Sequence, residues 1–163
     1  NGNIILDCHW FESNVVWVFS EDDQPPEILG RKSFSIDQAH TLRIENRIPV
    51  YGLDVSIDNF PHEIQRTEQA INFNKGCYLG QEPIARIDAM GHVNWMLVLI
   101  EAPKEIPLTP NTSLTAHDKI VAKICSVQIH NDDYHRYALA LVRRELANPS
   151  TEIQTDQGII KVT

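Results

Sequence analysis

The second half of the chain carries the clearest hydrophobic pattern, a series of short segments in which apolar and polar residues alternate. Alternation of this kind, interrupted by turn residues, is typical of antiparallel strands with one buried face. The segments predicted as strands are residues 93–101, 113–117, 119–130 and 134–143, with a closing pair around 156–158. Their number and spacing favour a small antiparallel β-barrel or sandwich.

The first part of the chain has a different pattern, in which short apolar runs precede a helix signal. Residues 3–7 and 15–19 are separated by polar residues and predict a β-hairpin. Further along, Ser35 and Gln38 have the spacing of a capping box, in which each side chain binds a backbone N–H at the start of a helix. A helix is therefore expected to follow Ser35 and to end before Pro49.

Between this helix and the barrel, the chain has the composition of a loop followed by short elements. Residues 51–62 are rich in Gly, Asp, Asn and Pro, which predicts a turning loop of the kind that often lines binding sites. A short strand is predicted at 71–73 and a helix at about 81–88. The expected fold class is α+β, with a partial mixed sheet-and-helix domain over residues 1–90 and a small antiparallel β-barrel over residues 91–163.

Composition and charge narrow the range of functions. The 163 residues include 22 Asp plus Glu against 14 Lys plus Arg, for a formal net charge of -8, which argues against direct binding of duplex nucleic acid. No apolar run in the sequence approaches the ~20 residues of a membrane span, so no membrane partner is expected. Three widely spaced cysteines favour neither a disulfide framework nor a zinc site. We expect no stable metal and a reducing compartment, either the bacterial cytoplasm or the mitochondrial matrix.

The segment from Lys75 to Glu82, Lys-Gly-Cys-Tyr-Leu-Gly-Gln-Glu, carries the most unusual chemistry. It places Cys77 between Gly76 and Gly80, two residues that permit backbone angles that others resist, at the mouth of the predicted helix. Backbone amides at a helix start and the Lys75 ammonium both favour a thiolate, whereas Glu82 opposes it. Cys77 is therefore a candidate reactive thiol. The alternative is a small buried side chain in a tight turn.

This segment does not stand alone, and together with several others it resembles the YgfZ family of folate-binding proteins, which is related to the aminomethyltransferase, or T-protein, of the glycine cleavage system. The other matching segments are Leu42-Arg43-Ile44-Glu45, Pro49-Val50-Tyr51-Gly52, Ala85-Arg86 and Gly91-His92-Val93-Asn94. The resemblance runs from the first hairpin to about Glu152 and matches the C-terminal part of longer proteins. The sequence departs from the family in two places: Pro83 is an unusual residue after the Gln-Glu pair, and Met90 before Gly91 and Trp95 after Asn94 stand around a segment where the family often has Arg. Basic contacts are therefore expected to be absent at that edge, which weighs against an anionic ligand there.

The resemblance implies a ring of domains whose central channel holds tetrahydrofolate, and a role in the assembly or repair of iron–sulfur enzymes, including those that modify tRNA. The implied partners are folate, iron–sulfur enzymes or assembly factors, and an N-terminal region of the same protein that this chain lacks. An aminomethyltransferase-like one-carbon transferase is the enzymatic alternative. That reaction needs a positioned carboxylate near the reacting nitrogen, and none is matched here. An inactive, interaction-only fragment is the third possibility.

The resemblance also assigns roles to individual residues. Cys77 matches the family cysteine, and its flanks match at Lys75, Gly76, Tyr78, Gly80, Gln81 and Glu82. Glu45 matches an acidic residue that lies close to the pterin, where a carboxylate can accept two N–H bonds. Tyr51 and Gly52 are expected on the channel wall. Arg86 is expected to pair either with the glutamate tail of folate or with Glu82, four residues before it.

Overall fold

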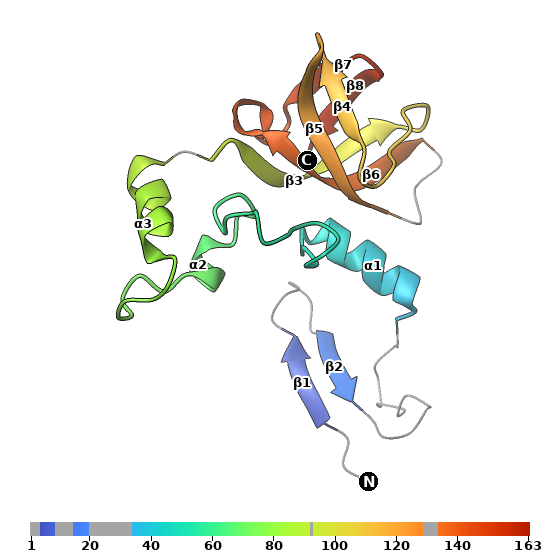
Figure 1. Cartoon of the computed structure of the whole chain (residues 1–163). Helices are drawn as coiled ribbons and strands as arrows, with labels where there is room; N and C mark the ends of the chain where they lie inside the picture. The colour runs from blue at the N-terminus through green and yellow to red at the C-terminus, as the bar shows by residue number, and fades with distance from the viewer. Residues whose placement is uncertain (1–3, 9–14, 20–33, 92, 129–133) are drawn as a thin grey trace.

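The computed structural model describes residues 4–8, 15–19, 34–91, 93–128 and 134–163, which form a β-hairpin, three α-helices and a six-stranded sheet (Figure 1). The strands are β1 (Ile4–Cys8), β2 (Val15–Phe19), β3 (Trp95–Pro103), β4 (Ser113–Ala116), β5 (Lys119–Val127), β6 (His135–Arg143), β7 (Glu152–Thr155) and β8 (Gly158–Val162). The helices are α1 (Ile36–Glu45), α2 (Thr67–Ala70) and α3 (Gln81–Met90), with a short 3-10 turn at Arg144–Leu146. This arrangement confirms the α+β class.

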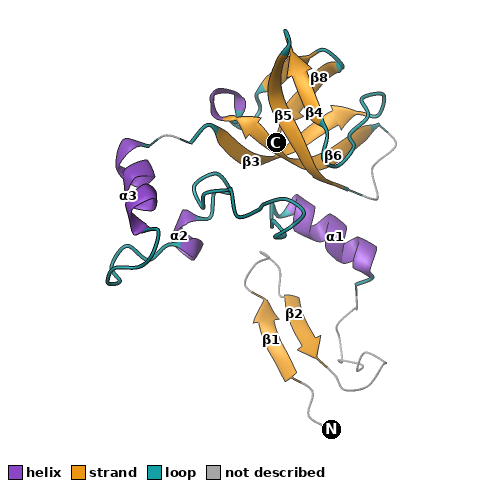
Figure 2. Cartoon of the chain, viewed as in Figure 1, coloured by secondary structure: helices purple, strands orange, loops and turns teal. Residues whose placement is uncertain are grey.

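The six-stranded sheet is antiparallel, with the order β4-β5-β6-β3-β8-β7. It curls until its two edges meet: the backbone N–H of Asp156 donates to the carbonyl of Thr115 at 2.7 Å, and the Thr115 hydroxyl donates to the Asp156 carboxylate at 2.6 Å. Irregular pairing between Leu114 and Thr115 and between Ile124 and Ser126 adds bends that help the sheet to close. The small barrel predicted from the alternating pattern is thus confirmed (Figure 2).

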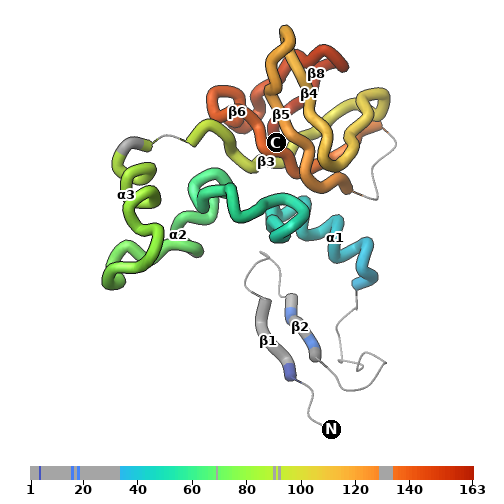
Figure 3. Tube along the Cα trace, viewed as in Figure 1, coloured from blue at the N-terminus to red at the C-terminus, as the bar shows by residue number. Residues whose placement is uncertain are grey.

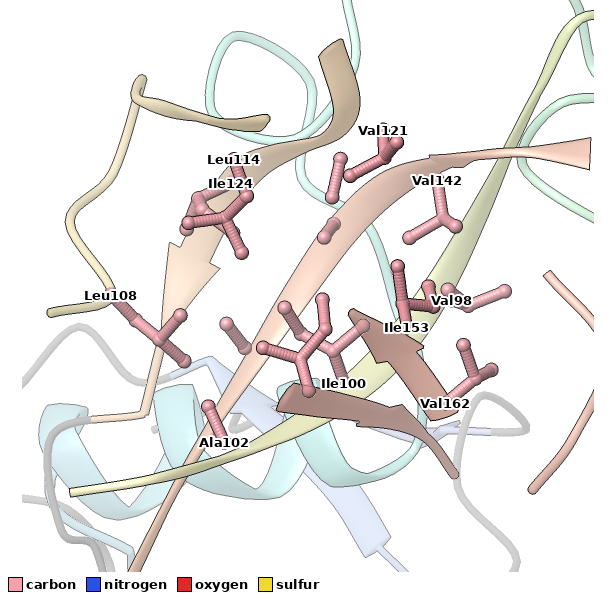
Figure 4. Close-up of a cluster of buried hydrophobic side chains, with 14 of the residues drawn as sticks. Val98, Ile100, Ala102, Leu108, Leu114, Val121, Ile124, Val142, Ile153 and Val162 are labelled. Carbon is pink, nitrogen blue, oxygen red and sulfur yellow. The ribbon is translucent and has the colours of Figure 1, made fainter. Parts of the chain in front are cut away.

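The interior of the barrel is filled by one face of every long strand. Val98, Ile100 and Ala102 point inward from β3, and Ala138 and Ala140 do so from β6. Figure 4 shows Val98, Ile100 and Ala102 packed with branched side chains from β4, β5, β7 and β8. The small alanines on β6 leave room for these larger neighbours, which is the usual way in which a narrow barrel is filled.

A second core forms on the outside of the same sheet. Leu97 and Leu99 on β3 and Leu139 on β6 are the alternate residues of their strands, and they bury Ile44 of α1 completely. The strands therefore have two apolar faces at this point, one inside the barrel and one against α1. This contact fixes α1 beneath the barrel and positions the loop that follows it.

The loop after α1 runs beneath the barrel toward α2, and α3 lies to one side of the barrel (Figure 3). The capping box is confirmed, since Gln38 N–H donates to Ser35 Oγ at 3.1 Å and Ser35 N–H donates to Gln38 Oε1 at 2.9 Å. Helix α3 is also confirmed and extends two residues beyond the predicted 81–88. The strand predicted at 71–73 is wrong: α2 occupies 67–70, and turns follow.

The remaining predictions concern strand ends and membrane spans. The final residues of the predicted strand 119–130, at 129 and 130, lie outside the described residues. The hairpin β1–β2 has the predicted antiparallel pairing, with Ile4 opposite Phe19. In the part of the chain that the structure describes, every helix is too short or too polar to cross a membrane.

Candidate functional site

A buried ion pair organises the junction between α1, the following loop and the barrel. The guanidinium of Arg43 donates to Asp54 Oδ2 at 2.7 Å and to Ser126 Oγ on β5 at 2.7 Å. The side chains of Arg43 and Asp54 are 9% and 0% exposed. Asp54 also accepts from the backbone N–H of Val50 at 2.9 Å, so this carboxylate holds the loop against the helix.

Glu45, two residues after Arg43 at the end of α1, lies at the same junction. Its Oε1 accepts a hydrogen bond from the Gln128 side-chain amide at 2.7 Å, and Gln128 is itself buried. The Glu45 side chain is exposed, and no described residue donates to its Oε2. One carboxylate oxygen is therefore held by a barrel residue, while the other accepts no hydrogen bond from the described residues.

Tyr51 and Gly52 follow in the loop after α1. Tyr51 is 72% exposed, so its ring is open to solvent on this chain. Gly52 has φ +87°, a left-handed conformation that favours glycine, and its N–H donates to the Val55 carbonyl at 2.8 Å. The turn at Gly52 brings the chain against the barrel, where Gly52 itself lines a hollow.

The same loop forms one wall of a hollow of about 360 Å³ against the barrel. The other wall comes from the β4–β5 region. Polar and thiol groups contribute much of the lining, among them Asn59, Asn111, Ser113, Lys123 and Cys125. Gly52 lines this hollow as well, and it is the one predicted site residue that does so.

Cys77 lies in the turn between α2 and α3, and it is exposed. Helix α3 begins at Gln81, whose N–H donates to the Tyr78 carbonyl at 3.2 Å. The Lys75 ammonium lies 4.3 Å from the centre of the Tyr78 ring, so a cation–π contact orders the residues on either side of the cysteine. The alternative of a buried structural thiol is excluded by this exposure.

The two glycines of this motif differ in their roles. Gly80 has φ +86° and precedes the first residue of α3, so its left-handed conformation starts the helix. Gly76 has no left-handed φ, and a Cβ at this position would meet nothing within 4 Å. The expectation that both glycines supply unusual backbone angles is therefore correct for Gly80 and wrong for Gly76.

Arg86 and Glu82 are both exposed on α3. They form no ion pair with each other, although their spacing allows one, and no other described residue pairs with either of them. The predicted helical pairing is wrong for this structure. A fully solvated pair gains little, because the Coulomb attraction in water barely exceeds the side-chain entropy lost.

The structure brings the predicted site residues together in two groups. Glu45, Tyr51 and Gly52 lie at the end of α1 and in its following loop, whereas Cys77 and Arg86 belong to the α2–α3 region. Figure 1 shows these two regions apart, with the loop after α1 running between them. No group of three or more His, Cys, Asp or Glu side chains able to hold a metal occurs among the described residues.

Several residues of the junction were missed by the sequence analysis. Asp54 resembles an ordinary turn residue in the sequence, and Gln128 resembles a polar position near a strand end. Cys125 also has a distinct environment, since burial raises its pKa to about 11. An arginine at a core-facing helix position was a usable signal for Arg43, because such a residue needs a buried acid.

The architecture defined here is a small antiparallel barrel preceded by a helix, a long loop and a second helical segment. This is the aminomethyltransferase-like fold: the glycine cleavage system aminomethyltransferase T from Bartonella henselae matches it with a TM-score of 0.61 at 18% sequence identity. The match covers 76% of this chain and 36% of the aminomethyltransferase, so the chain spans about a third of that protein's length. No protein-family model matches the sequence. No curated protein matches it either.

Proposed function

We propose that this chain is the C-terminal part of a tetrahydrofolate-binding accessory protein for the assembly or repair of iron–sulfur clusters, including those of tRNA-modifying enzymes. Cys77 is its chemical centre. The observation that carries the proposal is the exposure of Cys77 in a turn directly before a helix, on an aminomethyltransferase-like fold. A thiol in this position reaches a partner without any rearrangement of a core.

The role of Cys77 is a temporary contact to a cluster or to a partner protein. An iron–sulfur cluster is ordinarily held by four cysteine thiolates. No set of ligands accompanies Cys77 in the described residues. Any cluster contact therefore needs further ligands from the client protein. The chain releases the cluster when ligands of the client occupy every coordination position of the cluster, including the one that Cys77 held.

The folate part of the proposal rests on Glu45. Its Oε1 is held at 2.7 Å by Gln128, and this bond sets the orientation of the whole carboxylate. The free Oε2 then accepts an N–H bond from the aminopyrimidinone edge of the pterin. Tyr51, exposed next to the Gly52 turn, offers a flat surface for the rings. The remainder of the binding site comes from the N-terminal region of the same protein.

The second candidate is one-carbon transfer to tetrahydrofolate, which the name of the structurally similar protein favours. It requires an acid or base beside the reacting nitrogen. The two candidates differ in product: only the transferase converts tetrahydrofolate when an aminomethyl donor is added, and the accessory protein leaves it unchanged.

The test is calorimetric titration of the full-length protein with tetrahydrofolate, repeated with the Glu45→Gln variant. This substitution keeps an oxygen for Gln128 and removes the charge. We expect the affinity to fall about tenfold or more, which is typical of a lost charge-assisted hydrogen bond. Glu152→Gln, at an exposed position on β7, is the matched control and leaves the affinity unchanged. Equal affinity of Glu45→Gln and the unmodified protein contradicts the assigned role of Glu45.

A further inference from the structure

Trp95, at the start of β3, carries two cations on its indole ring. The Lys123 ammonium lies 4.6 Å from the ring centre, and the Arg143 guanidinium lies 4.2 Å from it. We call these three residues the Trp95 cation site. The expectation that this edge lacks basic contacts because Trp95 replaces an arginine is therefore wrong, since strands β5 and β6 supply the charge instead.

The sheet register explains how three distant positions meet. Trp95 on β3 is directly opposite Arg143 on β6, and Lys123 on β5 is opposite Leu141, two residues before Arg143. All three side chains leave the outer face of the sheet, because residues two apart on a strand share a face. The site is thus built on rigid barrel strands rather than on a loop.

The positive charge of this site is uncompensated within the described residues. The ion pairs there are Arg43–Asp54, His62–Asp88 and His135–Glu101, and none of them includes Lys123 or Arg143. The Nε of Arg143 donates to the Ile120 carbonyl at 3.2 Å, which fixes the plane of the guanidinium. The two terminal nitrogens make no described hydrogen bond. An oriented guanidinium with its terminal N–H groups free is the geometry that binds an oxyanion in a bidentate manner.

From this geometry we infer that the Trp95 cation site binds the phosphate or carboxylate group of a small anionic ligand. Lys123 also lines the hollow of about 360 Å³ against the loop at 52–59, so the uncharged body of the ligand extends into that hollow. A cavity of this volume is at the lower end of the range for small-molecule sites. The amide and hydroxyl side chains of its lining, among them Asn59, Asn111 and Ser113, suit a polar body.

The gathering of two like charges on one ring makes this assignment specific. The chain has a formal net charge of -8, so a diffuse attraction for anions is absent and only a local site can hold one. Both cations lie within 4.6 Å of the centre of one ring, so an oxyanion bound at this site offsets the repulsion between them. The inference is independent of Cys77 and of Glu45.

The test uses calorimetry and the fluorescence of the three tryptophans, Trp95 among them, with four probes: inorganic phosphate, AMP, adenosine and glutarate. We expect AMP or glutarate to bind saturably, adenosine not to bind, and AMP to bind more tightly than inorganic phosphate because its body enters the hollow. Whichever of AMP and glutarate binds more tightly identifies the oxyanion. The Arg143→Gln variant is expected to lose about tenfold in affinity. Lys104→Gln, which removes an exposed lysine from the turn after β3, retains the affinity of the unmodified protein.

Binding measurements on the unmodified protein are enough to contradict the inference, and the variants add a further test. Failure of AMP and glutarate to bind at millimolar concentration contradicts it, as does a fluorescence change that sodium chloride reproduces at equal ionic strength. An equal loss in Lys104→Gln and Arg143→Gln shows only general charge attraction and also contradicts the site. Equal affinity for AMP and inorganic phosphate removes the hollow from the proposal.

Discussion

Replacement of Arg43 by methionine tests whether the buried ion pair holds the junction on which Glu45 lies. Methionine keeps the length and the apolar stem of the side chain while it removes the charge. The change breaks the bonds of the guanidinium to Asp54 and to Ser126, each 2.7 Å long, and a third bond to the Ile48 carbonyl at 3.2 Å. The Asp54 side chain, 0% exposed, then remains buried without its cation.

The magnitude follows from what Asp54 retains. Its Oδ1 has no hydrogen-bond partner within the described residues, and its Oδ2 keeps only the Val50 N–H at 2.9 Å. Breaking a buried ion pair by removal of one partner costs about 3–5 kcal/mol. For a chain of this length each kcal/mol lowers the Tm by about 2–4 °C, so we expect a decrease of roughly 6–20 °C.

The assay is urea and thermal unfolding followed by circular dichroism. Arg47→Met is the matched control, since the Arg47 side chain is exposed and makes a single hydrogen bond, to the Thr163 carbonyl at 2.7 Å. We expect this substitution to cost about 1 kcal/mol. In the double variant Arg43→Met/Asp54→Leu, part of the lost stability returns because no charge remains buried. A loss below about 1 kcal/mol in Arg43→Met refutes the reasoning, because the pair would then contribute no more than an exposed contact.

Two further predictions concern the barrel. Burial raises the pKa of the Cys125 thiol from 9.0 to about 11, so as the pH rises the unfolded chain loses this proton before the folded chain does. The stability that Cys125 contributes is therefore present below pH 9 and is lost as the pH rises toward 11. The difference in unfolding free energy between the unmodified protein and Cys125→Ala should therefore shrink over this range, and a constant difference contradicts the prediction. Gly158→Ala should destabilise by about 1–3 kcal/mol in urea unfolding, since φ is +134° and the new Cβ would lie 2.8 Å from Ile106 Cδ1. Gly76→Ala, with neither constraint, serves as its control, and an equal effect of the two contradicts the argument.

Much of the fold could be predicted from the sequence, because in the barrel and in α1 the local sequence preferences agree with the tertiary packing. The alternating residues of 93–143 fill the barrel with one face, and Ser35 and Gln38 start α1 as their spacing indicates. The strand predicted at 71–73 was wrong because Ile71 and Phe73, the two residues of β propensity there, have no neighbouring strand to pair with among the described residues. Local preference alone does not form a strand without a ladder.

The candidate site was less accessible to sequence reasoning, since its contacts join residues far apart in the chain. Gln128 reaches Glu45, and Ser126 reaches Arg43, across 83 positions. Similarly, the cations around Trp95 come from two other strands, so the residue type at position 95 gave a misleading expectation. Exposure of Cys77 was also undetermined, because a cysteine between glycines is compatible with a buried turn.

The most direct test of the proposed function is the alkylation rate of Cys77 by iodoacetamide at neutral pH, measured by mass spectrometry in the folded chain and in urea. N-acetylcysteine in each solution corrects for the effect of urea on the reagent. If Cys77 is a reactive thiol in the folded protein, the corrected rate is higher in the folded chain than in the unfolded one. A corrected rate that is equal or lower when the chain is folded would contradict the claim that this exposed thiol is the chemical centre of the protein.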